Sequence, residues 1–250
     1  MIVARLKPEQ TLEEHLKLCI EALKSLSSIK ILDIFKGTEN LLKIAIVFHD
    51  SGKIFYQQRI KKGKGFLGHE LFSTFIVDEF LQCEDLRVSF DSRFLIDAIV
   101  LYHHYAMGLS KREEKFFREF KSGFRISEDF EKILREHEEI VLELLNLDES
   151  ATKKAMKKVN IAVKGHLEKG LLQYGWIFKN LRYINKEIWD RFVADRVFRK
   201  LMLVGINVMT IVDYLGAKTE DGRGSEFSRV IDEFISLYYR GGLNKGSESF

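Results

Sequence analysis

The chain has 250 residues, of which 46% are hydrophobic and 31% charged, so it can bury a sizeable core within a single domain. The formal net charge of +3 excludes attraction to nucleic acid through overall charge, which leaves only local basic patches for that role. The two cysteines, Cys19 and Cys83, lack the spacing of a disulfide framework or a thiolate metal site, and we expect them in the core. The longest apolar run, 201–212, is too short to span a bilayer, so we expect a cytoplasmic protein with no membrane partner.

The spacing of apolar residues predicts an all-α helical bundle. Residues 1–7 are a short strand or an extended lead-in, and Thr11 with Glu14 forms a capping box that starts the first helix. Further helices are expected at 39–50, 68–81, 92–105, 183–215 (one or two helices) and 226–239. We expect one domain over 1–240, with a charged helical insertion at about 111–182, and a flexible tail over 241–250.

The most informative stretch is AIVFHDSGK, residues 45–53, in which an apolar helical run ends in His49 and Asp50. An imidazole beside a carboxylate offers a metal ion one nitrogen and one hard oxygen. A buried helix that ends in two ionisable groups also needs partners for them. The alternative is a capped, solvated helix end.

Other candidate ligands lie at helix ends or on helices with an apolar face. His15 lies at the edge of such a face, where the alternative is an ordinary half-buried histidine. His69 lies in the first turn of its helix. His103 and His104 end another helix, and both reach one ion only if that helix end faces the site; otherwise His104 is an outer or surface group. A carboxylate such as Asp213, within an apolar run, is costly unless it binds a metal or forms a helix-end salt bridge.

Residues 54–68, IFYQQRIKKGKGFLG, are expected to form a mobile loop beside the site. Aromatic residues (Phe55, Tyr56 and Phe66) flank four basic ones: Arg59, Lys61, Lys62 and Lys64. Such a loop can bind phosphates and stack on the bases of a single strand, whereas the alternative is a solvated turn.

The charged segment 111–148 is expected to carry no chemistry. His137 and His166 are expected on the surface, since their neighbours are charged. A basic cluster of Lys153, Lys154, Lys157 and Lys158 either contacts phosphates or is simply a solvated face.

In chain order, the candidate ligands resemble those of the HD phosphohydrolase superfamily. Within it, the chain is similar to the HD nuclease of type I CRISPR interference, the partner of a DNA-unwinding helicase. The resemblance lies in HDSGK at 49–53 followed by Gln57 or Gln58, GHELFST at 68–74, the paired histidines, and Asp213 followed by Ala217. It covers roughly 11–217, although 111–183 contributes no motif.

The resemblance implies two metal positions that share Asp50. His15, His49 and Asp213 would complete the first, and His69, His103 and His104 the second. Two divalent ions about 3.5–4 Å apart stabilise the attacking and leaving oxygens of a phosphodiester. Imidazole-rich ligation favours Mn, Co, Ni or Fe, with Mg also open. Lys53 would neutralise charge on the scissile phosphate or assist the leaving group, so Asp50 and Lys53 are the expected catalytic residues.

By this resemblance we expect a metal-dependent endo- or exonuclease that cuts single-stranded DNA, with RNA also open. No helicase motif accompanies the nuclease motifs, so the chain resembles the stand-alone form that works with a separate helicase subunit in a CRISPR interference complex. The alternatives are an HD phosphohydrolase of nucleotides or cyclic dinucleotides, and a non-catalytic scaffold subunit of such a complex.

Overall fold

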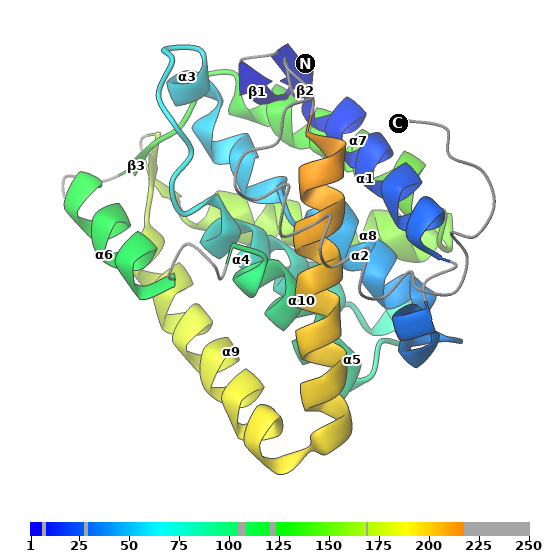
Figure 1. Cartoon of the computed structure of the whole chain (residues 1–250). Helices are drawn as coiled ribbons and strands as arrows, with labels where there is room; N and C mark the ends of the chain where they lie inside the picture. The colour runs from blue at the N-terminus through cyan, green and yellow to red at the C-terminus, as the bar shows by residue number, and fades with distance from the viewer. Residues whose placement is uncertain (7–8, 28–29, 105–108, 121–123, 169, 218–250) are drawn as a thin grey trace.

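The computed structural model describes residues 1–6, 9–27, 30–104, 109–120, 124–168 and 170–217 (Figure 1). It confirms the all-α prediction. The helices are α1 (Leu12–Leu26), α2 (Glu39–Phe48), α3 (Gln57–Ile60), α4 (His69–Leu81), α5 (Phe90–Tyr102), α6 (Leu109–Glu119), α7 (Phe130–Leu145), α8 (Glu149–Gly165), α9 (Tyr174–Ala194) and α10 (Arg196–Gly216), with 3-10 turns η1 (Lys30–Phe35), η2 (Ser51–Tyr56) and η3 (Glu84–Leu86). The predicted helix at 226–239 and tail at 241–250 lie outside the described residues.

The strands are short. β1 (Val3–Leu6) and β2 (Glu9–Thr11) form an antiparallel hairpin, so the strand alternative for the N-terminus is confirmed. The expected capping box is present, because Thr11 Oγ1 accepts from the Glu14 amide and the Glu14 carboxylate accepts from the Thr11 amide. A three-stranded sheet of β3 (Phe124–Arg125), β5 (Leu171–Leu172) and β4 (Leu167–Glu168) was not predicted, because two-residue strands leave no periodic signal.

Helices α4 and α5 form the centre of the bundle. Every residue of α4 is buried, because α5, α8, α9 and η2 all pack against it. Helix α10 runs along the front of the bundle in Figure 1 and packs on both α1 and α5. Its end approaches α1 closely: a Cβ on Gly216 would lie 2.4 Å from Cys19 Sγ and 3.2 Å from the His15 carbonyl oxygen. A larger residue there would push α10 away from His15.

Part of the segment predicted to be a mobile loop is helical instead. Residues 51–60 form η2 and α3, and Phe55 and Tyr56 are fully buried, so these two rings cannot stack on bases. Phe55 packs on Phe72 and Phe130, with ring centroids 5.0 and 5.4 Å apart. Only the turns at 61–68 match the predicted loop. Glycines at 63 and 65 had suggested an irregular segment longer than the one that forms.

The charged insertion is an integral part of the core. Helix α7 packs on α2 and η2, and α8 packs on α4. His137 is 1% exposed, with its Nε2 2.8 Å from Ser51 Oγ, so the prediction of a solvated face is wrong. His166 is half-buried and stacks on Trp176, with ring centroids 4.1 Å apart. Within the described ranges, no helix combines the length and the apolar character needed to cross a membrane.

Candidate metal centre

The bundle brings all seven predicted metal ligands together. Four of them lie at helix ends: His49 caps α2, Asp50 starts η2, His69 starts α4 and His103 caps α5. His104 follows directly. His15 projects from α1 and Asp213 from α10, the two helices whose close approach Gly216 permits.

Four ligand atoms define a first metal position. His15 Nε2 lies 3.3 Å from His49 Nε2, 3.3 Å from Asp50 Oδ2 and 3.1 Å from Asp213 Oδ1. His49 Nε2 lies 3.6 Å from Asp50 Oδ2 and 3.4 Å from Asp213 Oδ1. Ligands bound at about 2.1 Å from one ion lie about 3.0 Å apart at right angles and about 3.4 Å apart in a tetrahedron. The four side chains can therefore hold a metal ion.

Three histidines form a second group. His69 Nε2 lies 3.3 Å from His104 Nε2, and the ligand atoms of His69, His103 and His104 all lie within 4.8 Å of one another. His103 Nε2 is buried and has no hydrogen-bond partner among the described residues. A buried polar atom without a partner costs about 1–3 kcal/mol, a cost that a bound metal ion would remove. The second group can also hold a metal ion.

The Asp50 carboxylate lies between the two groups. Its Oδ2 faces His15 and His49, whereas its Oδ1 lies 3.0 Å from His69 Nε2. The side chain is 1% exposed. Asp50 is thus the one described residue with an oxygen directed at each group.

Backbone carbonyls orient three of the histidines. In each, Nδ1 lies within hydrogen-bond distance of the carbonyl oxygen three residues earlier: His49 to Ile46 at 2.7 Å, His69 to Phe66 at 2.9 Å and His103 to Val100 at 2.6 Å. A carbonyl only accepts, so Nδ1 carries the proton and Nε2 keeps its lone pair. This is the arrangement that metal-binding histidines commonly show.

The protonation states of most of the ligands suit metal binding near pH 7. Burial alone would raise the pKa of Asp50, but Lys53 and His49 outweigh it and hold that pKa well below its usual value. A hydrogen bond from His15 likewise keeps the pKa of Asp213 low in spite of burial. Burial and the nearby His49 lower the pKa of His103 to about 4. Both carboxylates are therefore charged and His103 is neutral, as ligation requires. His15 differs: burial alone would lower its pKa, but Cys19 and hydrogen bonds to Asp213 and Asp50 raise that pKa well above its usual value, so a bound metal ion would have to displace the His15 proton.

Lys53 lies beside the bridging carboxylate. Its Nζ donates to Asp50 Oδ2 at 2.5 Å and lies 4.2 Å from the centre of the Phe66 ring. Gly52 makes this turn possible, because a Cβ there would lie 2.0 Å from the His69 carbonyl oxygen. The glycine of HDSGK thus lets η2 touch the start of α4.

Two contacts behind the ligands were missed in the sequence. Arg112 of α6 donates to both carboxylate oxygens of Glu70, at 2.5 and 2.8 Å, and Glu70 Oε2 lies 3.4 Å from His69 Nδ1. On α1, Cys19 Sγ lies 3.6 Å from His15 Nε2. The segment 111–148 thus contributes Arg112, which pairs with the carboxylate behind His69. Glu70 gave a signal, since it stands directly beside a predicted ligand.

A cavity of about 230 Å³ opens onto the centre. Asp50, Lys53, His104 and Asp213 face it, and Phe66 forms part of its wall. A small anionic group that enters this cavity would therefore meet the bridging carboxylate and the Lys53 ammonium together.

The predicted nucleic-acid-binding residues fall into two kinds. Arg59 is half-buried, forms an ion pair with Glu119, and stacks over Phe120 at 4.7 Å. Lys61, Lys62 and Lys64 are exposed, and the last two line a neighbouring cavity of about 230 Å³ together with Arg125. In the second basic cluster, Lys153 and Lys154 form exposed ion pairs with Glu149 and Asp85.

The centre therefore consists of two groups of histidine and aspartate side chains, most of them buried, that can hold metal ions and that share one carboxylate. No family model matches the chain, and comparisons with curated proteins and with solved structures found no similar protein.

Proposed function

We propose that the chain is a metal-dependent nuclease that hydrolyses phosphodiester bonds of single-stranded DNA, and of RNA as a second substrate, with two divalent ions. The position of Asp50 supports this proposal most strongly, because one carboxylate directed at two ligand groups is the usual way to hold two ions close together. His15, His49 and Asp213 would complete one position, and His69, His103 and His104 the other. Ions bound there would stabilise the attacking and leaving oxygens of the phosphodiester.

The donor set favours a transition metal. Five imidazoles and two carboxylates suit Mn, Co, Ni or Fe better than Mg, which prefers an all-oxygen set. The oriented Nε2 lone pairs of His49, His69 and His103 suit the same ions.

Lys53 has the second role in the proposal. Its ammonium lies at the wall of the cavity, where it would sit beside a phosphate that approaches Asp50. A fixed positive charge there would stabilise the extra negative charge that develops on the phosphate during hydrolysis.

The size of the cavity and the residues around it favour a nucleic-acid strand over a free nucleotide as the substrate. The cavity, at about 230 Å³, is smaller than the roughly 300–1,000 Å³ of typical small-molecule sites. Phe66 in its wall follows directly on the exposed Lys61, Lys62 and Lys64, which would contact successive phosphates outside the cavity.

The proposed protein partner is supported only by the sequence motifs. On the resemblance to the HD nuclease of type I CRISPR interference, we propose that a separate helicase subunit of the interference complex delivers the unwound strand. The chain would then act as the cutting subunit, and not as a scaffold.

The test is hydrolysis by the purified protein and by Asp50→Ala, with Asp33→Ala, an exposed acidic residue, as a matched control. Labelled single-stranded DNA and RNA, duplex DNA, nucleotides and cyclic dinucleotides are each incubated with Mg, Mn, Co and Ni. We expect cleavage of single strands that Asp50→Ala loses and Asp33→Ala retains. Hydrolysis of small nucleotides alone would instead identify a nucleotide phosphohydrolase, and no turnover with any ion would support a scaffold.

A further inference from the structure

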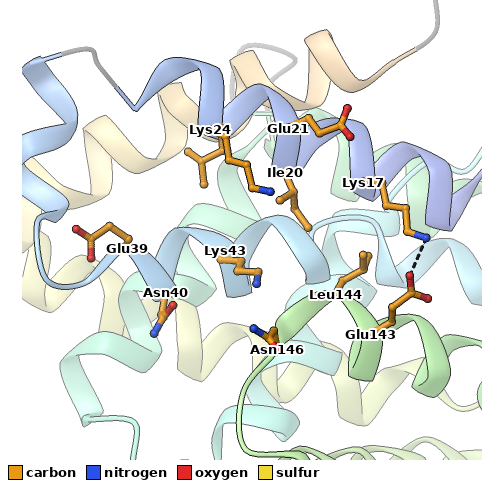
Figure 2. Close-up of a pocket in the computed structure, with 11 residues that line it drawn as sticks. Lys17, Ile20, Glu21, Lys24, Glu39, Asn40, Lys43, Glu143, Leu144 and Asn146 are labelled. Atoms are coloured by element: carbon orange, nitrogen blue, oxygen red, sulfur yellow. Dashed lines mark ion pairs between the residues drawn. The ribbon is translucent and has the colours of Figure 1, made fainter.

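A separate cavity of about 370 Å³ lies between α1, the start of α2 and the end of α7 (Figure 2). Lys24, which lines it, stands nine residues after His15 on α1, which places the two side chains about 180° apart around the helix. The cavity therefore lies on the opposite face of α1 from the metal centre. Its volume is within the range of small-molecule sites.

The walls of this cavity differ in character. Ile20, Leu23 and Leu144 give it an apolar surface, and the Asn40 and Asn146 carboxamides add polar groups. A ligand that fills it would therefore need both an apolar part and a polar head.

Two lysines in the cavity have no counter-ion. Among the described residues, Lys24 and Lys43 have neither an ion pair nor a side-chain hydrogen bond, although both line the same space. Burial, and then the positive charge of Lys24, lower the pKa of Lys43. The neighbouring Lys17 differs, because it pairs with Glu13 at 2.6 Å and with Glu143 at 2.7 Å.

The acidic residues of the rim do not neutralise this pair. Glu143 is paired with Lys17, and Glu39 accepts a hydrogen bond from the Gly37 amide at 2.9 Å. Figure 2 shows the carboxylates of Glu21 and Glu39 directed away from the Lys24 and Lys43 ammonium groups. The ammonium groups of Lys24 and Lys43 therefore repel each other beside an apolar surface, and an anionic ligand would neutralise them.

We propose that this cavity binds a small phosphomonoester, with its phosphate on Lys24 and Lys43 and its organic part on Ile20, Leu23 and Leu144. Two ammonium groups match a dianion better than a single carboxylate. Asn146, whose side chain points toward Lys43 in Figure 2, would donate a further hydrogen bond to the phosphate.

Calorimetric titration of the metal-free protein with phenyl phosphate and with inorganic phosphate tests this site. We expect one phenyl phosphate bound per chain in this cavity, with higher affinity than inorganic phosphate because only the phenyl ring reaches the apolar wall. Lys24→Met and Lys43→Met should each weaken binding about tenfold, the loss of one charge-assisted contact. Lys17→Met, whose ammonium is already paired, should stay within about twofold of the wild type.

Thermal unfolding of the same variants checks that a lost signal is not lost folding. Phenyl phosphate should raise the melting temperature of the wild type and of Lys17→Met by similar amounts, and that of folded Lys43→Met by less. No binding to the wild type, or equal binding by Lys24→Met, Lys43→Met and the wild type, would overturn the proposal. Equal affinity for the two ligands would overturn the role of the apolar wall.

Discussion

The Lys53 ammonium lies 2.5 Å from Oδ2 of Asp50, the same oxygen that faces the first metal position. The positive charge of Lys53 would repel a divalent ion bound there and so weaken metal binding. The same charge would attract the phosphate of a substrate and so favour hydrolysis. We therefore expect Lys53→Met to bind Mn about fivefold to tenfold more tightly and to hydrolyse single strands about a hundredfold more slowly. Calorimetry and single-turnover rates, with Lys61→Met as the exposed control, measure the two effects. If the Mn affinity and the hydrolysis rate of Lys53→Met both equalled those of the wild type, Lys53 would have no role in the site.

The buried Glu70 depends on Arg112 for its charge. Removal of the guanidinium would leave a carboxylate that is fully buried without its bidentate partner, so we expect Arg112→Met to lower the free energy of unfolding by about 3–5 kcal/mol. Arg118→Met on the same helix breaks only an exposed pair and should cost less than about 0.5 kcal/mol. Urea denaturation measures both. Addition of Glu70→Gln to Arg112→Met should recover stability, and a further loss would contradict this account of the pair.

We expect His103 to lower the stability of the metal-free protein and to strengthen metal binding. Its buried Nε2 has no partner in the described part of the chain, so His103→Leu should raise the free energy of unfolding of the metal-free protein by about 1–2 kcal/mol. The same variant should weaken Mn binding at the second position, whereas His166→Leu should leave Mn binding unchanged. Denaturation in chelator and Mn titration are the two measurements. A less stable variant that binds Mn as the wild type does would show that His103 is only a packing residue.

His137 should make the fold sensitive to acid. Burial lowers its pKa to about 4, below the ordinary 6.5, so the unfolded chain binds a proton before the folded one does. The stability that neutral His137 contributes is complete above pH 6.5 and is lost as pH falls toward 4, by about 3 kcal/mol in total. The free energy of unfolding should therefore fall less between pH 7 and pH 4 in His137→Gln than in the wild type, by about 3 kcal/mol. An identical pH profile for the two proteins would contradict this prediction.

The candidate metal ligands were predictable because of where they stand in the helical pattern. Asp213 interrupts an apolar run and His49-Asp50 ends a buried helix, and such residues need partners whatever the tertiary structure. The contacts behind them were not predictable in the same way. Arg112 reaches Glu70 from 42 residues away, and His137 reaches Ser51 from 86 residues away, so only the packing of α6 and α7 brings these pairs together. The helical turn at 51–60 was not predicted, because nearby glycines suggested a loop. This turn is buried because Phe55 packs on Phe72 and Phe130, which are distant in the sequence.

The number of ions bound per chain tests the shared role of Asp50 most directly. Native mass spectrometry of Mn-loaded protein should find two ions in the wild type, one in Asp213→Ala and none in Asp50→Ala. Of the residues that the structure describes, only Asp50 has an oxygen directed at each group. The Asp33→Ala control should keep both. If Asp50→Ala held as many ions as Asp213→Ala, Asp50 would not join the two positions and the proposed two-metal centre would be wrong.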